Sequence, residues 1–405
     1  MAQQDDANRR TGGSGGDLGR LDTGRETRLG GARDGRLYCT RGRTVGVWTP
    51  VTGFRPLGTL PVPGRGASNA AFRLRNGALA QRLLRPVVGA WTTTNLWPLS
   101  DEALLATHGL QVYRSGDRGR SWAPVHRLPP SSGPMGVLPT SVCRHDGRLY
   151  LAEYTLGDEP ARILESRDDG RTWGTYLETT AVRHFHGVFD DPHRDALWAT
   201  SGDTDRESAV GRLEDGRFVR VGSGSQQWRA VSLAFTPSAV LWGMDCSYAD
   251  EPELLRLDRD GAEAPTTVGT TDGSIYYSGT LRVDGDRWVA FTTAAETGRD
   301  STAEPEQHGG PDGDLARVLV ASAASDYERW HELAAFQRRR PAGGRVPGVP
   351  TANAYVFLAT DPSLGLLMNP FNTRTGHGSV LRIPPERLPQ LAAESPTLGG
   401  ALAPR

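Results

Sequence analysis

The sequence predicts an all-β fold, a single β-propeller with seven blades. Three observations support this prediction. The chain has 50 Gly and 28 Pro among 405 residues, a composition that favours short strands and turns over long helices. One turn motif occurs twice, with its first residue at Ser115 and again at Ser166, 51 positions later. One apolar strand pattern recurs along the whole chain. A period near 50 residues is typical of propellers, in which each repeat forms one four-stranded blade.

The repeated turn motif reads S-x-D-x-G-x-[ST]-W. Its copies consist of Ser115, Asp117, Gly119 and Trp122, and of Ser166, Asp168, Gly170 and Trp173. We expect the Asp to accept backbone N–H bonds in a tight turn, the Gly to take a positive φ, and the Trp to pack under the hairpin. The motif resembles the Asp-box, or BNR repeat, of sialidase-like propellers. That resemblance implies that both Asp residues are turn residues on the outer part of a blade and not catalytic groups.

The apolar pattern occurs seven times after a polar turn, and we interpret it as the second strand of each blade. The seven copies begin at Arg36, Ala103, Arg148, Ala196, Val240, Arg287 and Tyr355. Seven copies predict seven blades, with a six-bladed sialidase-like propeller as the alternative if the terminal segments combine into one blade. Residues 70–85 interrupt the regular spacing of the repeats and suggest a short helix or a decorated hairpin. Residues 296–314 are polar and Gly/Pro-rich, which suggests an inserted loop.

Composition also sets expectations for the domain limits, the compartment and the partners. Residues 1–33 have almost no large apolar side chains, which predicts a disordered tail, followed by a propeller over 34–390 and a C-terminal tail over 391–405. Three distant cysteines and no apolar leader favour a cytoplasmic protein. All 46 basic residues are Arg, interleaved with 47 acidic ones, so a nucleic-acid partner is not expected. The sequence has no run of about 18 apolar residues, so a membrane span is not expected.

Propeller topology locates the functional site. Alternate residues of each innermost strand face the central channel, and the loops after the second strands emerge where the innermost strands begin. The predicted innermost strands span 93–97, 140–143, 183–187, 228–232 and 274–278. Acidic, His, Arg and Tyr side chains meet on that rim, which predicts a polar ligand site there. The candidate catalytic residues are His186, Asp203, Asp245 and Tyr277, and the candidate ligand-binding residues are His184, Gln226, Arg229, Glu207 and Tyr276.

Each candidate has a structural alternative. His184 and His186 could chelate a divalent metal ion in the channel, with Asp203 or Gln226 as further ligands, or they could form a hydrogen-bonded pair lining the channel. Asp203, Asp205 and Glu207 could act in acid–base chemistry or cap a loop turn. Arg229 could neutralise an acidic ligand or form an inter-blade salt bridge. Of Tyr276 and Tyr277, one should lie in the core because neighbours on a strand alternate in facing.

The segment from His184 to Tyr277 also resembles a group of poorly characterised microbial propellers described as glycosyl-hydrolase-like. The matching pieces start at His186, Ser201, Gly224, Leu241 and Ile275. The resemblance implies a shared ligand site without an established chemistry. The function we expect at the funnel is binding and cleavage of a glycan or glycosylated metabolite, by a hydrolase or a uronate lyase. The front of the chain has Phe54-Arg-Pro-Leu57 in place of the F/Y-R-I-P motif of sialidases, so the family's Tyr–Glu nucleophile pair is not assigned. The alternative function is a non-catalytic propeller that binds a ligand or serves as an assembly scaffold.

Overall fold

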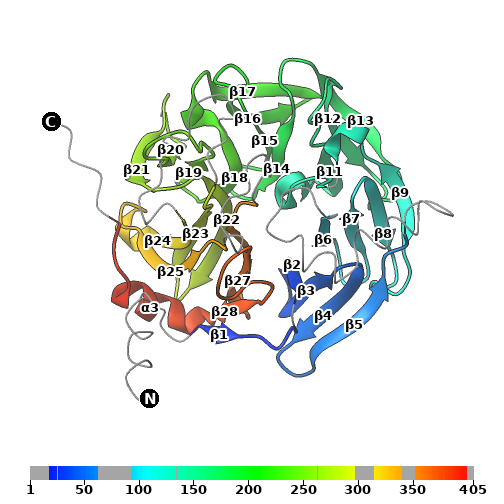
Figure 1. Ribbon diagram of the computed structural model, residues 1–405. Helices are drawn as coiled ribbons and strands as arrows, with labels where there is room; N and C mark the ends of the chain where they lie inside the picture. The colour runs from blue at the N-terminus through cyan, green and yellow to red at the C-terminus, as the bar shows by residue number, and fades with distance from the viewer. Residues whose placement is uncertain are drawn as a thin grey trace, which may run out of the picture.

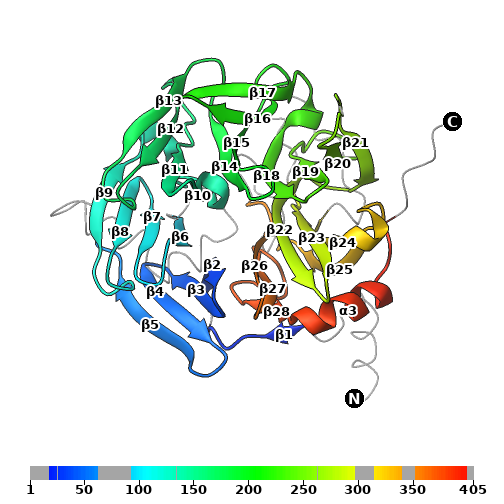
Figure 2. The same cartoon turned by 180° about the vertical axis from the view of Figure 1, so that it is seen from behind.

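The computed structural model describes residues 18–24, 26–62, 93–133, 135–261, 263–296, 314–339 and 352–398. Within these ranges the chain forms seven four-stranded antiparallel sheets arranged as the blades of a ring around a central channel (Figure 1). The view from behind shows the same ring (Figure 2). The prediction of a seven-bladed propeller is confirmed and the six-bladed alternative was wrong. Residues 70–85 and most of the predicted loop at 296–314 lie outside the described residues.

The first four blades follow the chain in order, each starting with its innermost strand. The first consists of β2 (Thr27–Arg33), β3 (Arg36–Arg41), β4 (Thr44–Thr49) and β5 (Gly53–Thr59). The second consists of β6 (Thr94–Pro98), β7 (Leu104–His108), β8 (Gln111–Ser115) and β9 (Ala123–Arg127). The third consists of β10 (Val142–His145), β11 (Arg148–Ala152), β12 (Ala161–Ser166) and β13 (Gly174–Thr179). The fourth consists of β14 (Phe185–Asp191), β15 (Ala196–Ser201), β16 (Ala209–Glu214) and β17 (Arg217–Ser223).

The remaining blades complete the ring. The fifth consists of β18 (Ala230–Phe235), β19 (Ala239–Met244), β20 (Glu253–Asp258) and β21 (Thr266–Thr270). The sixth consists of β22 (Ile275–Val283), β23 (Asp286–Thr293), β24 (Leu315–Ser322) and β25 (His331–Gln337). The seventh consists of β26 (Tyr355–Asp361), β27 (Gly365–Phe371), β28 (Leu381–Ile383) and β1 (Gly19–Arg20). The described residues contain one α-helix, α3 (Leu388–Glu394), and none of their helices is long and apolar enough to cross a membrane.

The two ends of the chain close the ring in the seventh blade. Strand β1 pairs antiparallel with β28, with Gly19 opposite Arg382 and Arg20 opposite Leu381. The predicted tail boundary at residue 33 was therefore wrong, because both β1 and β2 belong to the propeller. Strand β26 is the innermost strand of its blade and not the second, as the apolar run at Tyr355 had suggested. The predicted C-terminal tail from residue 391 was also wrong, because helix α3 extends through Glu394.

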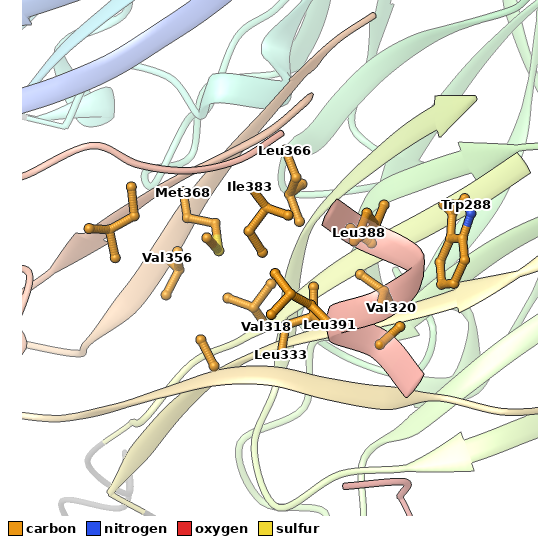
Figure 3. Packing of buried hydrophobic residues seen from close by; sticks show 14 of the residues in the cluster. Trp288, Val318, Val320, Leu333, Val356, Leu366, Met368, Ile383, Leu388 and Leu391 are labelled. Carbon is orange, nitrogen blue, oxygen red and sulfur yellow. The ribbon is translucent and has the colours of Figure 1, made fainter. Parts of the chain in front are cut away.

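Buried hydrophobic clusters fill the spaces between neighbouring blades. One cluster joins the sixth and seventh blades, where helix α3 places Leu388 and Leu391 against side chains of both sheets (Figure 3). Val318 and Val320 reach this cluster from β24, and Met368 reaches it from β27. The helix thus covers an apolar seam next to the blade where the ring closes, which keeps that seam from water.

The repeated S-x-D turns have the predicted local structure. In the first copy, which connects β8 to β9, the hydroxyl of Ser115 accepts the N–H of Gly119 at 2.8 Å. Asp117 accepts the N–H of Ser121 at 2.9 Å, and Gly119 has φ +86°. The second copy repeats these bonds at Ser166 and Asp168. Hydrogen bonds from Ser121 lower the pKa of Asp117 to about 2. The bonds support a structural role for both Asp residues.

Candidate functional site

A funnel-shaped cavity of about 480 Å³ lies at the centre of the ring. Residues of all seven blades line it, including Arg28, Thr94, Leu138, His186, Arg229, Tyr276 and Tyr355. Most of them come from the starts of innermost strands or from the loops after second strands, as Asp245 does after β19 and Glu296 after β23. The funnel therefore opens on the side of the ring that propeller topology predicts from the sequence.

Five of the nine candidate residues line the funnel, and four do not. His186, Arg229, Asp245, Tyr276 and Tyr277 are in its wall. His184 and Asp203 lie next to that wall, with His184 Nε2 3.7 Å from Asp203 Oδ1. Gln226 donates a hydrogen bond to Asp205 at 2.8 Å, and Glu207 accepts one from the Thr204 hydroxyl at 2.7 Å. The contact of Glu207 fits the loop-turn alternative, and Gln226 is bound to the same loop through Asp205.

The two histidines have fixed tautomers. His184 donates from Nδ1 to the carbonyl of Thr155 at 2.8 Å, and His186 donates from Nδ1 to the carbonyl of Ala230 at 3.0 Å. Since a carbonyl can only accept, Nε2 of each neutral ring carries a lone pair. Both rings are almost fully buried, and burial lowers the pKa of His184 to about 3 and that of His186 to about 4. Both are therefore neutral near pH 7.

Arg229 connects two acidic residues beside the histidines. Its Nη2 lies 3.3 Å from Asp203 Oδ1, and its Nε lies 3.3 Å from Asp245 Oδ2. Burial alone would lower the pKa of Arg229, but Asp245 and Asp203 raise it above its usual value. Arg183 holds the other oxygen of Asp203 at 2.9 Å. Two roles were considered for Arg229 from the sequence: an inter-blade salt bridge and the binding of an acidic ligand. Arg229 forms the salt bridge, and it also lines the funnel, as ligand binding would require.

Tyr276 forms a close pair with Glu296, a rim-loop carboxylate that the sequence placed near the site without a specific role. The Tyr276 hydroxyl donates to Glu296 Oε1 at 2.5 Å, and the hydroxyl of Ser274 donates to Oε2 at 2.5 Å. Asn353 donates to Oε1 at 3.0 Å. Burial, followed by the charge of Glu296, raises the pKa of Tyr276 well above 10. The phenol therefore keeps its proton, and the carboxylate is placed to accept it. The one available signal was the position of Glu296 after a second strand.

Tyr276 and Tyr277 both line the funnel, although strict alternation placed one of them in the core. The register of β22 against β23 shifts between Ile275 and Tyr277, which leaves Tyr276 as the extra residue of a bulge. A bulge re-aims the side chain that it inserts. Tyr277 belongs to a buried cluster, where its ring stacks on Phe357 with centroids 5.3 Å apart, and it also contacts the cavity.

Arg28 is a functional candidate that the sequence did not identify. It lies at the start of β2, its guanidinium carbon is 4.2 Å from the centre of the Phe357 ring, and its Nη2 donates to Asn95 Oδ1 at 2.7 Å. Among the described residues no carboxylate forms an ion pair with it, and its buried Nε has no hydrogen-bond acceptor. Burial lowers its pKa. Arg28 was overlooked because it falls inside the predicted N-terminal tail.

Comparison with known proteins finds similar structures only at low identity and with TM-scores below 0.5. No family model matches the chain, and no curated protein matches it. An oligogalacturonate lyase from Vibrio parahaemolyticus is similar in structure, with 10% identity, 91% of this chain and 92% of that chain covered, and a TM-score of 0.48.

Two further solved structures are similar at the same level. A puromycin-hydrolysing peptidase from Mycobacterium tuberculosis has 13% identity, 90% and 55% coverage and a TM-score of 0.48. An ancestral GH74 enzyme has 12% identity, 88% and 45% coverage and a TM-score of 0.47. The chain spans about half the length of these last two proteins. All three TM-scores are below 0.5, so these similarities support no inference about the function of this chain.

Proposed function

We propose that the chain is an enzyme that binds a carboxylate-bearing sugar in its central funnel and cleaves the glycosidic bond. A cavity of about 480 Å³ is within the usual range of small-molecule sites. Its wall combines aromatic rings, such as Tyr355 and Phe357, with polar groups, such as Asn353 and Asp245. Aromatic faces for stacking and side chains that hydrogen-bond hydroxyls are the features that a sugar ring requires.

Arg28 is the single observation that carries this proposal. Arg28 is half-buried in the funnel wall, and no carboxylate among the described residues neutralises its charge, which favours an anionic ligand. Arg is suited to this task because its planar fork binds a carboxylate through two parallel hydrogen bonds.

The Tyr276–Glu296 pair supplies a nucleophile with an adjacent base for hydrolysis. Tyrosine serves as the nucleophile in some glycosidases. In the first step Tyr276 Oη bonds to the anomeric carbon, its proton moves to Glu296, and the leaving oxygen takes a proton from solvent. In the second step water attacks the same carbon, Tyr276 leaves and regains its proton from Glu296, and the water gives its own proton to solvent. The net change is the addition of one water molecule across the glycosidic bond.

Elimination from a uronate is a second candidate, and His186 favours it. The Nε2 lone pair of this neutral ring lies in the funnel wall and can take the proton on the carbon next to the sugar carboxylate. The leaving oxygen then departs from the neighbouring carbon with a solvent proton, and a carbon–carbon double bond forms. Arg28 would neutralise the carboxylate in either reaction.

The test is turnover on matched acidic and neutral glycosides, such as aryl sialosides and glucuronides against aryl glucosides, together with uronic oligosaccharides. Hydrolysis releases new reducing ends, whereas elimination also produces an ultraviolet-absorbing unsaturated sugar. We expect cleavage of acidic substrates only, and a loss of about 10²–10⁴-fold in kcat for Tyr276→Phe and for Glu296→Gln if the reaction is hydrolysis. If the reaction is elimination, His186→Gln should show that loss.

The matched control is Tyr113→Phe, which removes a buried hydroxyl that donates to the carbonyl of Pro61 at 3.2 Å, away from the funnel. Its activity should stay near that of the unsubstituted protein. Tight binding of acidic sugars without turnover would contradict the enzymatic proposal and support a ligand-binding propeller. Equal turnover of acidic and neutral substrates would contradict the role of Arg28.

A further inference from the structure

His184, His186 and Asp203 form a compact group beside the funnel. One potential ligand atom of each lies within 4.8 Å of the others. His186 lies at the start of the innermost strand β14, His184 directly precedes that strand, and Asp203 lies in the loop after β15, the second strand of the same blade. We propose that these three side chains bind one divalent transition-metal ion. The binding site itself does not depend on the proposed function, but an ion on His186 Nε2 would occupy the lone pair that elimination needs, so metal binding favours hydrolysis over elimination.

The two imidazoles are arranged as metal ligands usually are. Each donates its Nδ1 proton to a backbone carbonyl, Thr155 for His184 and Ala230 for His186, and so turns an unprotonated Nε2 away from that carbonyl. Metal-binding histidines commonly make this second hydrogen bond, which fixes the tautomer and the orientation of the ring. The ring centroids of the two histidines are 5.1 Å apart. The strand therefore presents two ordered nitrogen lone pairs to one region.

The Nε2 atom of His184 has no hydrogen-bond donor. The residue is fully buried, and this nitrogen is a buried acceptor without a partner among the described residues. Its nearest charged neighbour is Asp203 Oδ1 at 3.7 Å, which is also an acceptor and cannot donate to it. Leaving a buried acceptor unsatisfied costs about 1–3 kcal/mol. Arg229 donates to Asp203 Oδ1 only over 3.3 Å, and no donor reaches His184 Nε2, so a cation between these acceptors would satisfy the unpaired nitrogen.

The donor set indicates the class of ion. Two imidazole nitrogens and one carboxylate oxygen suit Zn²⁺ and its transition-metal neighbours, whereas Ca²⁺ and Mg²⁺ prefer oxygen ligands alone. Ligand distances near 2.0–2.2 Å would require the three atoms to close in around the ion. Since the histidines are held on a strand, the carboxylate of Asp203 is the ligand that would move most.

The loop that carries Asp203 is packed tightly against the proposed site. A Cβ atom added at Gly202 would lie 2.7 Å from Arg229 Cγ and 2.9 Å from His186 Cε1. Asp203 itself has φ +134°, a backbone conformation that residues with side chains seldom adopt. Only glycine at position 202 lets this loop approach closely enough for Asp203 to reach the histidines.

The neighbouring arginines leave one carboxylate oxygen for the ion. Arg183 binds Oδ2 of Asp203 at 2.9 Å, and Arg229 makes a longer 3.3 Å contact with Oδ1. An ion at Oδ1 would replace this longer contact, and Arg229 would keep its ion pair with Asp245. Because two guanidinium groups lie close by, the ion should bind more tightly when an anion from the funnel completes its coordination. This last expectation rests on the proposed function.

The test is direct binding of metal to the full chain after treatment with a chelator. Isothermal titration with Zn²⁺, and visible absorption after titration with Co²⁺, should both give one ion per chain. His184→Gln should weaken binding at least tenfold, and Asp203→Asn should do the same while preserving the shape of the side chain. Circular dichroism of the metal-free variants shows whether each one is folded.

The matched control is His145→Gln. His145 also pairs with a carboxylate, through Nδ1 and Asp190 at 2.8 Å, but it lies on β10 away from the proposed site. This variant should bind Zn²⁺ as the unsubstituted protein does. Absence of binding to the folded protein would overturn the proposal, as would binding that His184→Gln and Asp203→Asn leave unchanged. Because the readout is binding without substrate, loss of the proposed enzymatic function would not affect it.

Discussion

Replacing Arg28 with Met tests whether the funnel is built for an anion. Met keeps much of the apolar contact with Phe357 and removes the charge. A hydrogen bond that involves a charged group contributes about 1.5–3 kcal/mol. At about 1.4 kcal/mol per factor of ten, the affinity for an acidic sugar should fall roughly 10- to 150-fold. The affinity for a neutral sugar should change by less than about twofold, because that ligand makes no ion pair.

The assay is calorimetric titration with matched ligands, for example N-acetylneuraminate and its methyl ester, which differ in the carboxylate charge. Arg28→Lys is an informative second variant, because it keeps the charge but loses the planar fork and should recover only part of the affinity. The melting temperature should change little in Arg28→Met, because removing a half-buried charge without a carboxylate partner favours the fold while losing the hydrogen bond to Asn95 Oδ1 opposes it. Equal weakening of both ligands, or a large fall in melting temperature, would refute the assignment and give Arg28 a purely structural role.

Two further predictions concern stability. The pKa values of His184 and His186 are lowered to about 3 and about 4, so between these values and the unfolded value near 6.5 the unfolded chain binds more protons. The free energy of unfolding should therefore fall as the pH drops below about 6.5, by up to about 3 kcal/mol for His186, and His186→Gln should flatten this dependence in denaturant titrations at several pH values. An unchanged slope in that variant would contradict the burial argument. Asp117→Ala removes the turn bonds to Ser121 and should cost about 1–3 kcal/mol of stability with turnover unchanged; loss of turnover in a stable variant would show that the residue is not merely a turn residue.

The fold was predictable because the signals that specify it are local and repeated. The turn bonds of Asp117 and Asp168 involve residues within four positions of each other, so a short motif contains all the information for them. The second strands are apolar on both faces because each is covered by neighbouring blades, as the fully buried β19 (Ala239–Met244) shows. These signals do not depend on which blades end up adjacent, and the sequence therefore indicates the number of blades before any long-range contact is known.

The ring closure could not be predicted in the same way. Strand β1 consists of Gly19 and Arg20, two residues that carry no apolar pattern, and their partner strand lies more than 350 positions away, at Arg382. Because residues 1–33 are polar, they were predicted to form a disordered tail, and Arg28 was therefore not considered as a site residue. The stabilisation comes from pairing with the opposite end of the chain, which composition within a short window cannot show.

The sequence predicted the face on which the funnel opens, and five of its nine candidates line the funnel. Bulges explain why strict alternation failed for Tyr276 and Tyr277. The register shifts at Gly30 in β2, at His186 in β14 and at Tyr276 in β22 each insert one extra residue into an innermost strand close to the funnel. Because alternate side chains of a strand point to opposite faces, the face of each residue is predicted from whether its position is odd or even. One inserted residue reverses that prediction for all the following residues of the strand. In β14 and β22 the inserted residue is itself a funnel residue. The bulges for which strict alternation fails are therefore the same features that turn a histidine and a tyrosine toward the funnel. Bulges next to a functional site are expected to re-aim side chains in this way.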